Sequence, residues 1–221
     1  GLYGLPVGVS GRVLHLLSGG IDSAVAAWLL MKRGCEIDFI HFHAFKKFDR
    51  RVNSKILDIV NLLVKYGYRS RIFFVPFYPF EIEATKIPPK YRLVLFRRFM
   101  LKVAEKLAKM YDIKAIGTGE NLAQVSSQTL YNLAVIGQAT KLQIFRPLLT
   151  YDKMEIIDLA KSIGTYEISI KPYKDCCSLF LTKHPITKAN LEKILEIEKK
   201  LNVRKAVKEA IENLEIVEVK I

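Results

Sequence analysis

The sequence has few cysteines and no long apolar run. Its 221 residues include three cysteines, an odd number that argues against the disulfide framework of a secreted protein. No uninterrupted apolar stretch approaches the roughly 20 residues that a helix needs to cross a bilayer, and the first residues lack the order of a signal peptide. We therefore expect a protein without membrane segments that works in the reducing environment of the cytoplasm.

Acidic residues are scarce relative to basic ones. The chain has 22 acidic and 35 basic residues, a formal net charge of +13 at pH 7. Such an excess attracts polyanions, and nucleic acids are the commonest of these in the cytoplasm, although a basic surface can also serve only solubility. Half of the residues are hydrophobic, which excludes a disordered or fibrous chain, and the length suits one domain.

Apolar segments that suit buried strands alternate with segments that suit helices. The expected strands are 12–17, 36–43, 71–77, 114–117, 143–145 and 215–221. The expected helices are 24–33, 49–66, 89–110, 124–136, 152–163, 187–201 and one that ends at 213. This order predicts an α/β fold with a parallel, doubly wound sheet, in which ligands bind beyond the carboxyl ends of the strands. Residues 168–183 suit a functional loop, and 187–221 suit a C-terminal extension.

The six residues 18–23, Ser-Gly-Gly-Ile-Asp-Ser, lie between the first expected strand and helix. Consecutive N–H groups of such a loop can converge on a phosphate, which the helix dipole also favours. Gly19 and Gly20 allow close backbone approach, and Ser18 and Ser23 can add hydroxyl donors. The lysine of a Walker P-loop is absent, which disfavours γ-phosphoryl transfer and is compatible with pyrophosphate as a leaving group.

Asp22 is the acidic residue of this loop. A carboxylate repels phosphate unless a divalent cation lies between them, so we assign Asp22 to Mg²⁺, directly or through water. The alternative is an ordinary strand-turn-helix in which Asp22 or Ser23 caps the helix.

The loop resembles the signature of the PP-loop ATP pyrophosphatases, which cleave ATP to AMP and pyrophosphate while they adenylate a carbonyl oxygen. Further segments narrow the resemblance: Gly-Leu-Pro-Val-Gly at 4–8, His41-Phe42-His43, Thr118-Gly119-Glu120, Gln124, Ser127-Gln128, Phe145-Arg146-Pro147-Leu148 and Asp175-Cys176-Cys177. Together they resemble the tRNA uridine 4-sulfurtransferase family, ThiI, over essentially the whole chain. The resemblance implies a fold of the adenine nucleotide alpha-hydrolase (PP-loop) type, ATP and Mg²⁺ as cofactors, and tRNA as substrate.

The resemblance also implies a set of nucleotide contacts. Leu16 and Leu17 can wall the adenine, and the backbone of His41 and Phe42 can read its edge. The remaining positions that match the family's ATP contacts are Arg97, Gly119 and Gln128.

Each of these positions also has an ordinary alternative. Without the family, we would interpret Gly119 as a loop glycine and Gln128 as a capping residue. His41 and His43 can equally be strand-end side chains without a catalytic role, and their spacing supports no zinc site. Arg98, next to Arg97, has solvent exposure as its alternative.

Sulfur insertion needs a nucleophile that carries sulfur, and a cysteine persulfide supplies one. Cys177 is our candidate by alignment with the family, and Cys176 stays as the alternative. Lys171 and Lys174 are close enough in sequence to lower a thiol pKa. Cys35 is expected to belong to the core. The alternative for the adjacent pair is two unreactive thiols.

The sequence departs from parts of the family pattern. It has neither the rhodanese domain that some members carry nor the Cys-x-x-Cys spacing that others have in this loop, so the sulfur relay is open. The family's N-terminal ferredoxin-like and THUMP domains are also absent, and the first residue is Gly1, so we expect a catalytic fragment of a longer protein.

The expected function is ATP-dependent adenylation of a tRNA uridine and replacement of its O4 by persulfide sulfur, which gives 4-thiouridine. The family implies a cysteine desulfurase as sulfur donor, a homodimer as oligomeric state, and sulfur supply for thiamine thiazole synthesis in some members. Two alternatives stay open. One is a PP-loop enzyme that acts on another tRNA base or a small-molecule carbonyl, and the other is a non-catalytic nucleotide or RNA sensor.

Overall fold

A computed structural model gives the three-dimensional structure, and it describes residues 4–45, 49–125, 127–173, 176–180, 182 and 185–221. The strands are β1 (Arg12–Leu16), β2 (Glu36–His43), β3 (Arg69–Pro76), β4 (Ala115–Gly117), β5 (Gln143–Phe145) and β6 (Glu215–Lys220). The helices are α1 (Ile21–Lys32), α2 (Ser54–Gly67), α3 (Tyr78–Ala84), α4 (Pro89–Met110), α5 (Leu130–Gly137), α6 (Lys153–Ser162), α7 (Tyr166–Ser169), the 3₁₀ helix η1 (Cys177–Phe180), α8 (Leu191–Glu198) and α9 (Val203–Glu212).

The six strands form one sheet in the order β5-β4-β1-β2-β3-β6. The first five are parallel, with β1 at the centre between β2 and β4. The last strand, β6, pairs antiparallel with β3 and opposes Val217 to Ile72. The expected α/β fold with a doubly wound sheet is confirmed, and the last strand adds one antiparallel edge to it.

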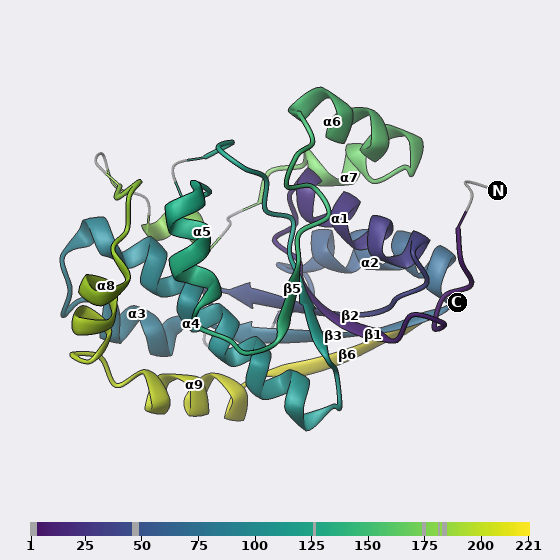
Figure 1. Ribbon diagram of the computed structural model, residues 1–221. Coiled ribbons are helices and arrows are strands. Elements are labelled where there is room, and N and C mark those ends of the chain that lie inside the picture. Colours follow the sequence, from purple (N-terminus) through teal and green to yellow (C-terminus); the bar gives the residue numbers. More distant parts are fainter. Residues whose placement is uncertain (1–3, 46–48, 126, 174–175, 181, 183–184) are drawn as a thin grey trace.

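Helices cover both faces of the sheet (Figure 1). Alternate residues of one strand point to opposite faces, so Phe39 packs in a core with α1 and α2, whereas its neighbour Ile40 packs in a second core with α4. Both residues are fully buried. Because parallel strands end at a common edge, this double covering leaves the carboxyl ends of β1, β2 and β4 as the place for a ligand.

Two helix starts agree closely with the sequence. Pro89 is the first residue of α4, where a missing N–H costs nothing. Asp152 caps α6, and its side chain accepts hydrogen bonds from the N–H groups of Met154 and Glu155 while the Glu155 carboxylate accepts one from Asp152 N–H. This capping box fixes the position of Lys153 in the first turn.

Other boundaries differ from the prediction. Helix α1 begins at Ile21 rather than at residue 24. The last three residues of the loop at 18–23, which we call the phosphate loop, therefore form the first turn of this helix. Helices α2, α5 and α8 each begin about four to six residues later than expected because the preceding residues form turns, such as the one in which Asp49 Oδ1 accepts a hydrogen bond from Arg51 N–H. The short helices α3, α7 and η1 were not predicted. Within the described part of the chain, no helix is long and apolar enough to cross a membrane.

Candidate nucleotide and sulfur-transfer site

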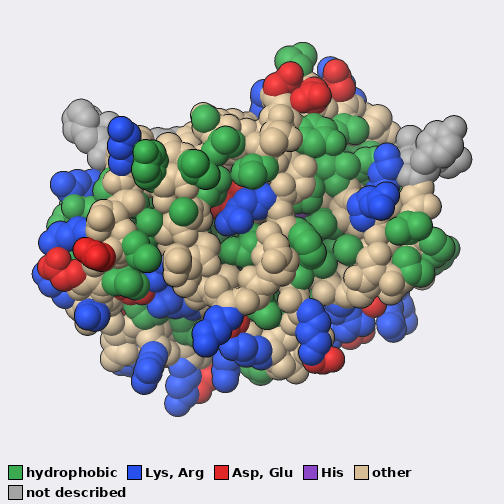
Figure 2. All heavy atoms as spheres, in the orientation of Figure 1, with side chains coloured by type: hydrophobic (Ala, Val, Ile, Leu, Met, Phe, Trp, Pro, Cys, Tyr) green, Lys and Arg blue, Asp and Glu red, His purple; other side chains and the backbone are tan. Residues whose placement is uncertain are grey.

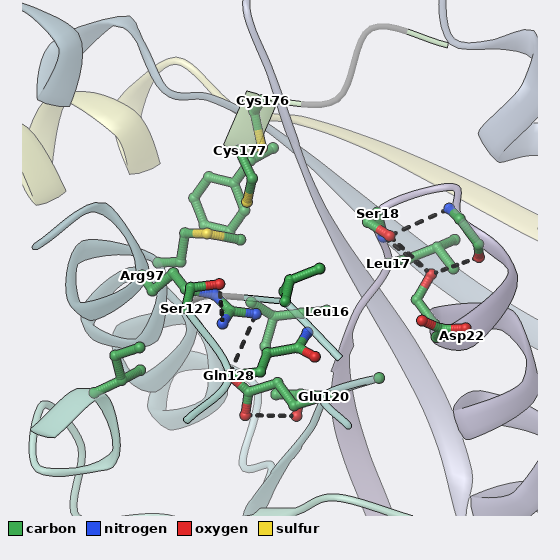
Figure 3. A pocket seen from close by; sticks show the side chains of 18 of the residues that line it. Leu16, Leu17, Ser18, Asp22, Arg97, Glu120, Ser127, Gln128, Cys176 and Cys177 are labelled. Atoms are coloured by element: carbon green, nitrogen blue, oxygen red, sulfur yellow. Dashed lines mark hydrogen bonds and ion pairs between the residues drawn. The ribbon is translucent and has the colours of Figure 1, made fainter. Parts of the chain in front are cut away.

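A cavity of about 300 Å³ lies at the carboxyl ends of the central strands (Figure 3). The predicted site residues that line it are Leu16, Leu17, Ser18, Gly20, Asp22, Ser23, His41, Phe42, Arg97, Gly119, Gln128, Cys176 and Cys177. Of the predicted set only Gly19 is not among the lining residues, although it belongs to the same loop. Residues separated by up to about 160 positions in the sequence thus meet in one cavity.

The loop at 18–23 is held by its own hydroxyl groups. Ser23 Oγ donates to the carbonyl oxygen of Gly20 at 3.1 Å and accepts from the Ser18 N–H at 3.2 Å. The Ser18 hydroxyl accepts from Gly20 N–H at 3.2 Å and lies 3.2 Å from Ser23 Oγ. Gly20 caps α1 without any side-chain hydrogen bond, so the alternative that Asp22 or Ser23 caps the helix is wrong. A helix start without a capping side chain is suited to an anion.

Glycine is required at two positions around this loop. Gly19 has φ +86°, and a Cβ there would lie 2.8 Å from Ile56 Cδ1. A Cβ on Gly119 would lie 2.7 Å from both N and Cα of Ser23. Gly119 therefore lets the end of β4 pack against the first turn of α1. The sequence analysis gave another reason for a glycine here, namely the close approach of ATP.

A lysine that the sequence analysis missed completes the loop. Lys153 Nζ lies 2.6 Å from Asp22 Oδ1, and both side chains are partly exposed. The capping box of α6 places this lysine, and α6 packs on α1. The cation that pairs with Asp22 thus comes from 131 residues further along the chain. Only the α6 cap was a sequence signal for it.

A buried carboxylate orients two arginines beside the cavity. Glu120 lies 3.3 Å from Arg97 Nη2 and 2.6 Å from Arg146 Nε, and it accepts a hydrogen bond from the Thr118 hydroxyl. Burial alone would raise the pKa of Glu120, but the two guanidinium groups outweigh burial and the pKa is lowered. Arg97 also donates to Ser127 Oγ at 3.3 Å. Its cationic group is therefore held at the cavity wall (Figure 3).

Arg98 does not face solvent, so that alternative is wrong. It is 2 % exposed, forms an ion pair with Glu198 at 3.0 Å and donates to the carbonyl oxygen of Val135. Because neighbouring residues of a helix point about 100° apart, α4 presents Arg97 to the cavity and Arg98 to α5 and α8.

Three histidines near the loop are buried and neutral. Burial lowers the pKa of His15, His41 and His43 to about 4 each. His15 Nε2 lies 2.8 Å from the Ser23 carbonyl oxygen, beneath the loop, and His43 stacks on Phe45. These contacts hold His15 and His43 against neighbouring groups of the fold.

His41 connects the loop to the segment that carries the cysteines. Its Nδ1 lies 2.7 Å from the carbonyl oxygen of Leu17, and its Nε2 lies 2.7 Å from the hydroxyl of Tyr173. The same hydroxyl lies 3.1 Å from Asn53 Oδ1. We call residues 169–180 the cysteine segment, of which Lys174 and Asp175 lie outside the described residues.

The two adjacent cysteines differ in exposure. Cys176 is buried among apolar residues of the α4 core, whereas Cys177, the first residue of η1, is partly exposed. The Cys177 side chain points toward the cavity (Figure 3). Cys35 is buried in the other core, as predicted, and burial raises the pKa of its thiol.

The structure does not show Lys171 or Lys174 beside the thiols whose pKa they were expected to lower. Lys171 is exposed and the structure shows its carbonyl oxygen, rather than its amine, in a hydrogen bond, which comes from Lys55 Nζ. Lys174 lies outside the described residues.

Basic side chains are exposed on the face of the molecule drawn in Figure 2. Figure 2 shows Lys and Arg side chains along the side of the molecule where α4 and α9 lie, and hydrophobic side chains over α5. Leu130 and Tyr131, the first two residues of that helix, are both more than half exposed.

A family model described as "Thiamine biosynthesis protein (ThiI)" matches residues 8–203. The chain belongs to the ThiI family. The expected resemblance is therefore confirmed over nearly the whole chain.

The relatives of this ThiI-family chain have consistent names. It is 46% identical over 208 residues to a "Probable tRNA sulfurtransferase" of Thermoanaerobacter sp. (strain X514), a match that spans 94% of this chain and 55% of the relative. A protein of the same name from Coxiella burnetii is 46% identical over 223 residues, which span 100% of this chain and 56% of that protein. The chain thus spans a little over half the length of the curated relatives it matches.

Two solved structures bear on the fold. A 4-thiouridine synthetase, crystallised as an RNA complex with bound ATP, is 39% identical with a TM-score of 0.91, covering 98% of this chain and 57% of that one. An NMN synthetase from Francisella tularensis has a TM-score of 0.53 at 17% identity, covering 91% of this chain and 81% of its own. The second likeness concerns the fold alone.

Proposed function

We propose that this chain carries the catalytic site of a tRNA sulfurtransferase that uses ATP to convert a uridine to 4-thiouridine. The observation that carries the proposal is the single cavity that a phosphate loop lines on one side and Cys177 on the other. ATP activation and sulfur transfer need those two groups within reach of one base. The ATP-bound and RNA-bound relative supports the same substrates.

The first step is attack of the uridine O4 on the α-phosphorus of ATP, with departure of pyrophosphate. The N–H groups at the start of α1 bind the leaving phosphates, Arg97 supplies positive charge at the cavity wall, and Lys153 supplies it beside Asp22. The adenine lies against Leu16 and Leu17, next to the end of β2.

The second step transfers sulfur. The terminal sulfur of a Cys177 persulfide attacks C4, the C4–O bond breaks, and AMP leaves with the former O4. The base is then joined to Cys177 through an S–S bond, which a second thiol cleaves to release 4-thiouridine and leave a disulfide. A cysteine desulfurase is the proposed persulfide source, and Cys176 is the alternative carrier because it lines the same cavity.

Mg²⁺ fits this site in a limited way. No cluster of three or more His, Cys, Asp or Glu side chains suited to a metal occurs in the described parts of the chain. Mg²⁺ commonly takes one or two carboxylates plus substrate phosphates, and Asp22 at the cavity provides one such ligand. When bound, the ion would neutralise charge on the leaving pyrophosphate.

The test is formation of 4-thiouridine in unmodified tRNA supplied with ATP, Mg²⁺, a cysteine desulfurase and cysteine. We expect product from the parent chain and at least about 100-fold less from Asp22→Ala and from Cys177→Ser. Asp58→Ala, an exposed position on α2, is the matched control and should retain activity.

Other outcomes separate the alternatives. Product that requires a longer chain with additional N-terminal domains would mean that tRNA docking lies outside these residues. Pyrophosphate release without tRNA would favour a small-molecule acceptor. ATP binding without any pyrophosphate release, together with indifference to Cys177→Ser, would favour a non-catalytic sensor.

A further inference from the structure

The start of the cysteine segment is tied to elements far away in the sequence. Lys55 Nζ, at the first turn of α2, donates to the carbonyl oxygens of Ser169 and Lys171 at 2.7 and 2.6 Å. The same amine lies 5.7 Å from the ring centroid of Tyr173. Lys55 is 8 % exposed, so these bonds are shielded from water.

Tyr173 then reaches the phosphate loop in two ways. Its ring lies against Gly19, because a Cβ built on that glycine would be 3.7 Å from a Tyr173 ring carbon. Its hydroxyl lies 2.7 Å from His41 Nε2, and the other nitrogen of that imidazole lies 2.7 Å from the carbonyl oxygen of Leu17. Leu17 is the residue immediately before the loop.

Hydrogen bonds join His41, Tyr173 and Asn53. A carbonyl oxygen can only accept, so His41 donates its Nδ1 proton to the carbonyl oxygen of Leu17. The Tyr173 hydroxyl lies 2.7 Å from His41 Nε2 and donates to Asn53 Oδ1 at 3.1 Å. An unbroken chain of hydrogen bonds therefore runs from the loop to a residue four positions before Cys177.

We propose that His41 and Tyr173 are positioning residues that hold the start of the cysteine segment against the phosphate loop, and so fix where Cys177 delivers its sulfur. The inference rests on the proposed function, because it assigns these residues to its second step. They contact neither reacting atom and act through the segment that they hold. The loop itself keeps its internal hydrogen bonds without the Tyr173 hydroxyl.

The test variant is Tyr173→Phe, which removes the hydroxyl and leaves the ring on Gly19. We expect thiolation with desulfurase-delivered sulfur to fall about tenfold or more, since small misplacements of a reacting group have such effects. Pyrophosphate release with tRNA, and thiolation with millimolar sodium sulfide that bypasses Cys177, should stay within about twofold of the parent. The matched control is Tyr66→Phe in α2, where the Tyr66 ring packs on Trp28 of α1.

A second measurement needs no activity. Alkylation of Cys177 by iodoacetamide, followed by peptide mass spectrometry, should be several-fold faster in Tyr173→Phe than in the parent or in Tyr66→Phe. Lys55→Met, which releases the segment at its other attachment, should give the same two changes and guards against a folding defect peculiar to one variant. Thermal unfolding establishes that each variant is folded.

The outcomes are distinct. An equal fall with both sulfur sources, or no change in either thiolation or alkylation, would overturn the positioning role. The parent chain could also make no 4-thiouridine from either sulfur source while Tyr173→Phe is still alkylated faster. That result would support the link between the phosphate loop and the cysteine segment and would reject the proposed function.

Discussion

The phosphate loop and the cysteine segment face the same cavity but are built in opposite ways. The hydroxyl groups of Ser18 and Ser23 bond to partners at most five residues away. The cysteine segment is held by partners 114 and 132 residues away, at Lys55 and His41. A loop that is held by hydrogen bonds between neighbouring residues can be predicted from a short sequence pattern. A segment that is held by residues far away in the sequence cannot. In the proposed mechanism the loop serves ATP activation and the segment serves sulfur delivery.

The largest expected effect tests that separation directly. Cys177→Ser should lower thiolation about 1,000-fold or more, as removal of a nucleophile does, and leave tRNA-dependent pyrophosphate release nearly unchanged. Asp22→Ala should lower both. A pyrophosphate assay and a thiouridine assay on the same samples measure this. If Cys177→Ser abolished pyrophosphate release as well, the two regions would not perform separate steps.

Lys153 sharpens the comparison because it is the distant element on the loop side. Lys153→Met should slow pyrophosphate release by about 100-fold, the size seen when one charge-stabilising donor is removed, and thiolation should fall in parallel. Lys161→Met on the same helix is the control, since that amine lies over the Tyr166 ring. Equal rates for both variants would remove Lys153 from the site.

Glu120 has a smaller predicted effect on the loop side. Glu120→Gln leaves Arg97 and Arg146 without their carboxylate, so ATP affinity should fall about tenfold through the displaced Arg97, and stability should fall by about 3 kcal/mol. Glu198→Gln disrupts a comparable buried pair with Arg98. That control should lose stability without losing ATP affinity in an equilibrium binding titration. Equal affinity losses in the two variants would mean a general effect of folding.

The last prediction concerns the pH dependence of stability. His15, His41 and His43 have a pKa of about 4 when folded and about 6.5 when unfolded. The unfolded state binds more protons than the folded state between these two pKa values. The stabilisation that depends on neutral histidines is therefore fully present above pH 6.5, and the free energy of unfolding falls as the pH is lowered toward 4. Each histidine adds up to about 1.4 kcal/mol per pH unit to the slope.

Denaturant titrations at pH 7, 6 and 5 measure this slope. His15→Gln, which removes one of the three buried imidazoles, should make it shallower. A free energy of unfolding that stays constant from pH 7 to pH 5 would contradict the burial of these groups at the loop end of the sheet.

Much of the loop side could be predicted from the sequence. The Ser-Gly-Gly-Ile-Asp-Ser pattern, the alternation of strands and helices and the Asp152 cap depend on neighbouring residues, and the structure agrees with them. The antiparallel direction of β6 could not be predicted, because an edge strand with most residues exposed has the same alternating pattern in either direction.

What the sequence did not reveal depends on tertiary contacts. Nothing in the sequence around Lys153 distinguishes it from other lysines. Only the packing of α6 on α1 brings it to Asp22. The burial of Arg98 was not predicted because its partner Glu198 comes 100 residues later. Gly119 lines the cavity, but its neighbour is the backbone of Ser23, which no pattern in the sequence indicates.

The most direct test of the central claim follows the oxygen that leaves the base. A tRNA labelled with ¹⁸O at the uridine O4 is incubated with the chain, ATP, Mg²⁺ and a persulfide source, and the nucleotide products are analysed by mass spectrometry. The account predicts one ¹⁸O atom in AMP for each 4-thiouridine formed, with unlabelled pyrophosphate. Label in inorganic phosphate, or ADP as the nucleotide product, would contradict adenylation of the uridine.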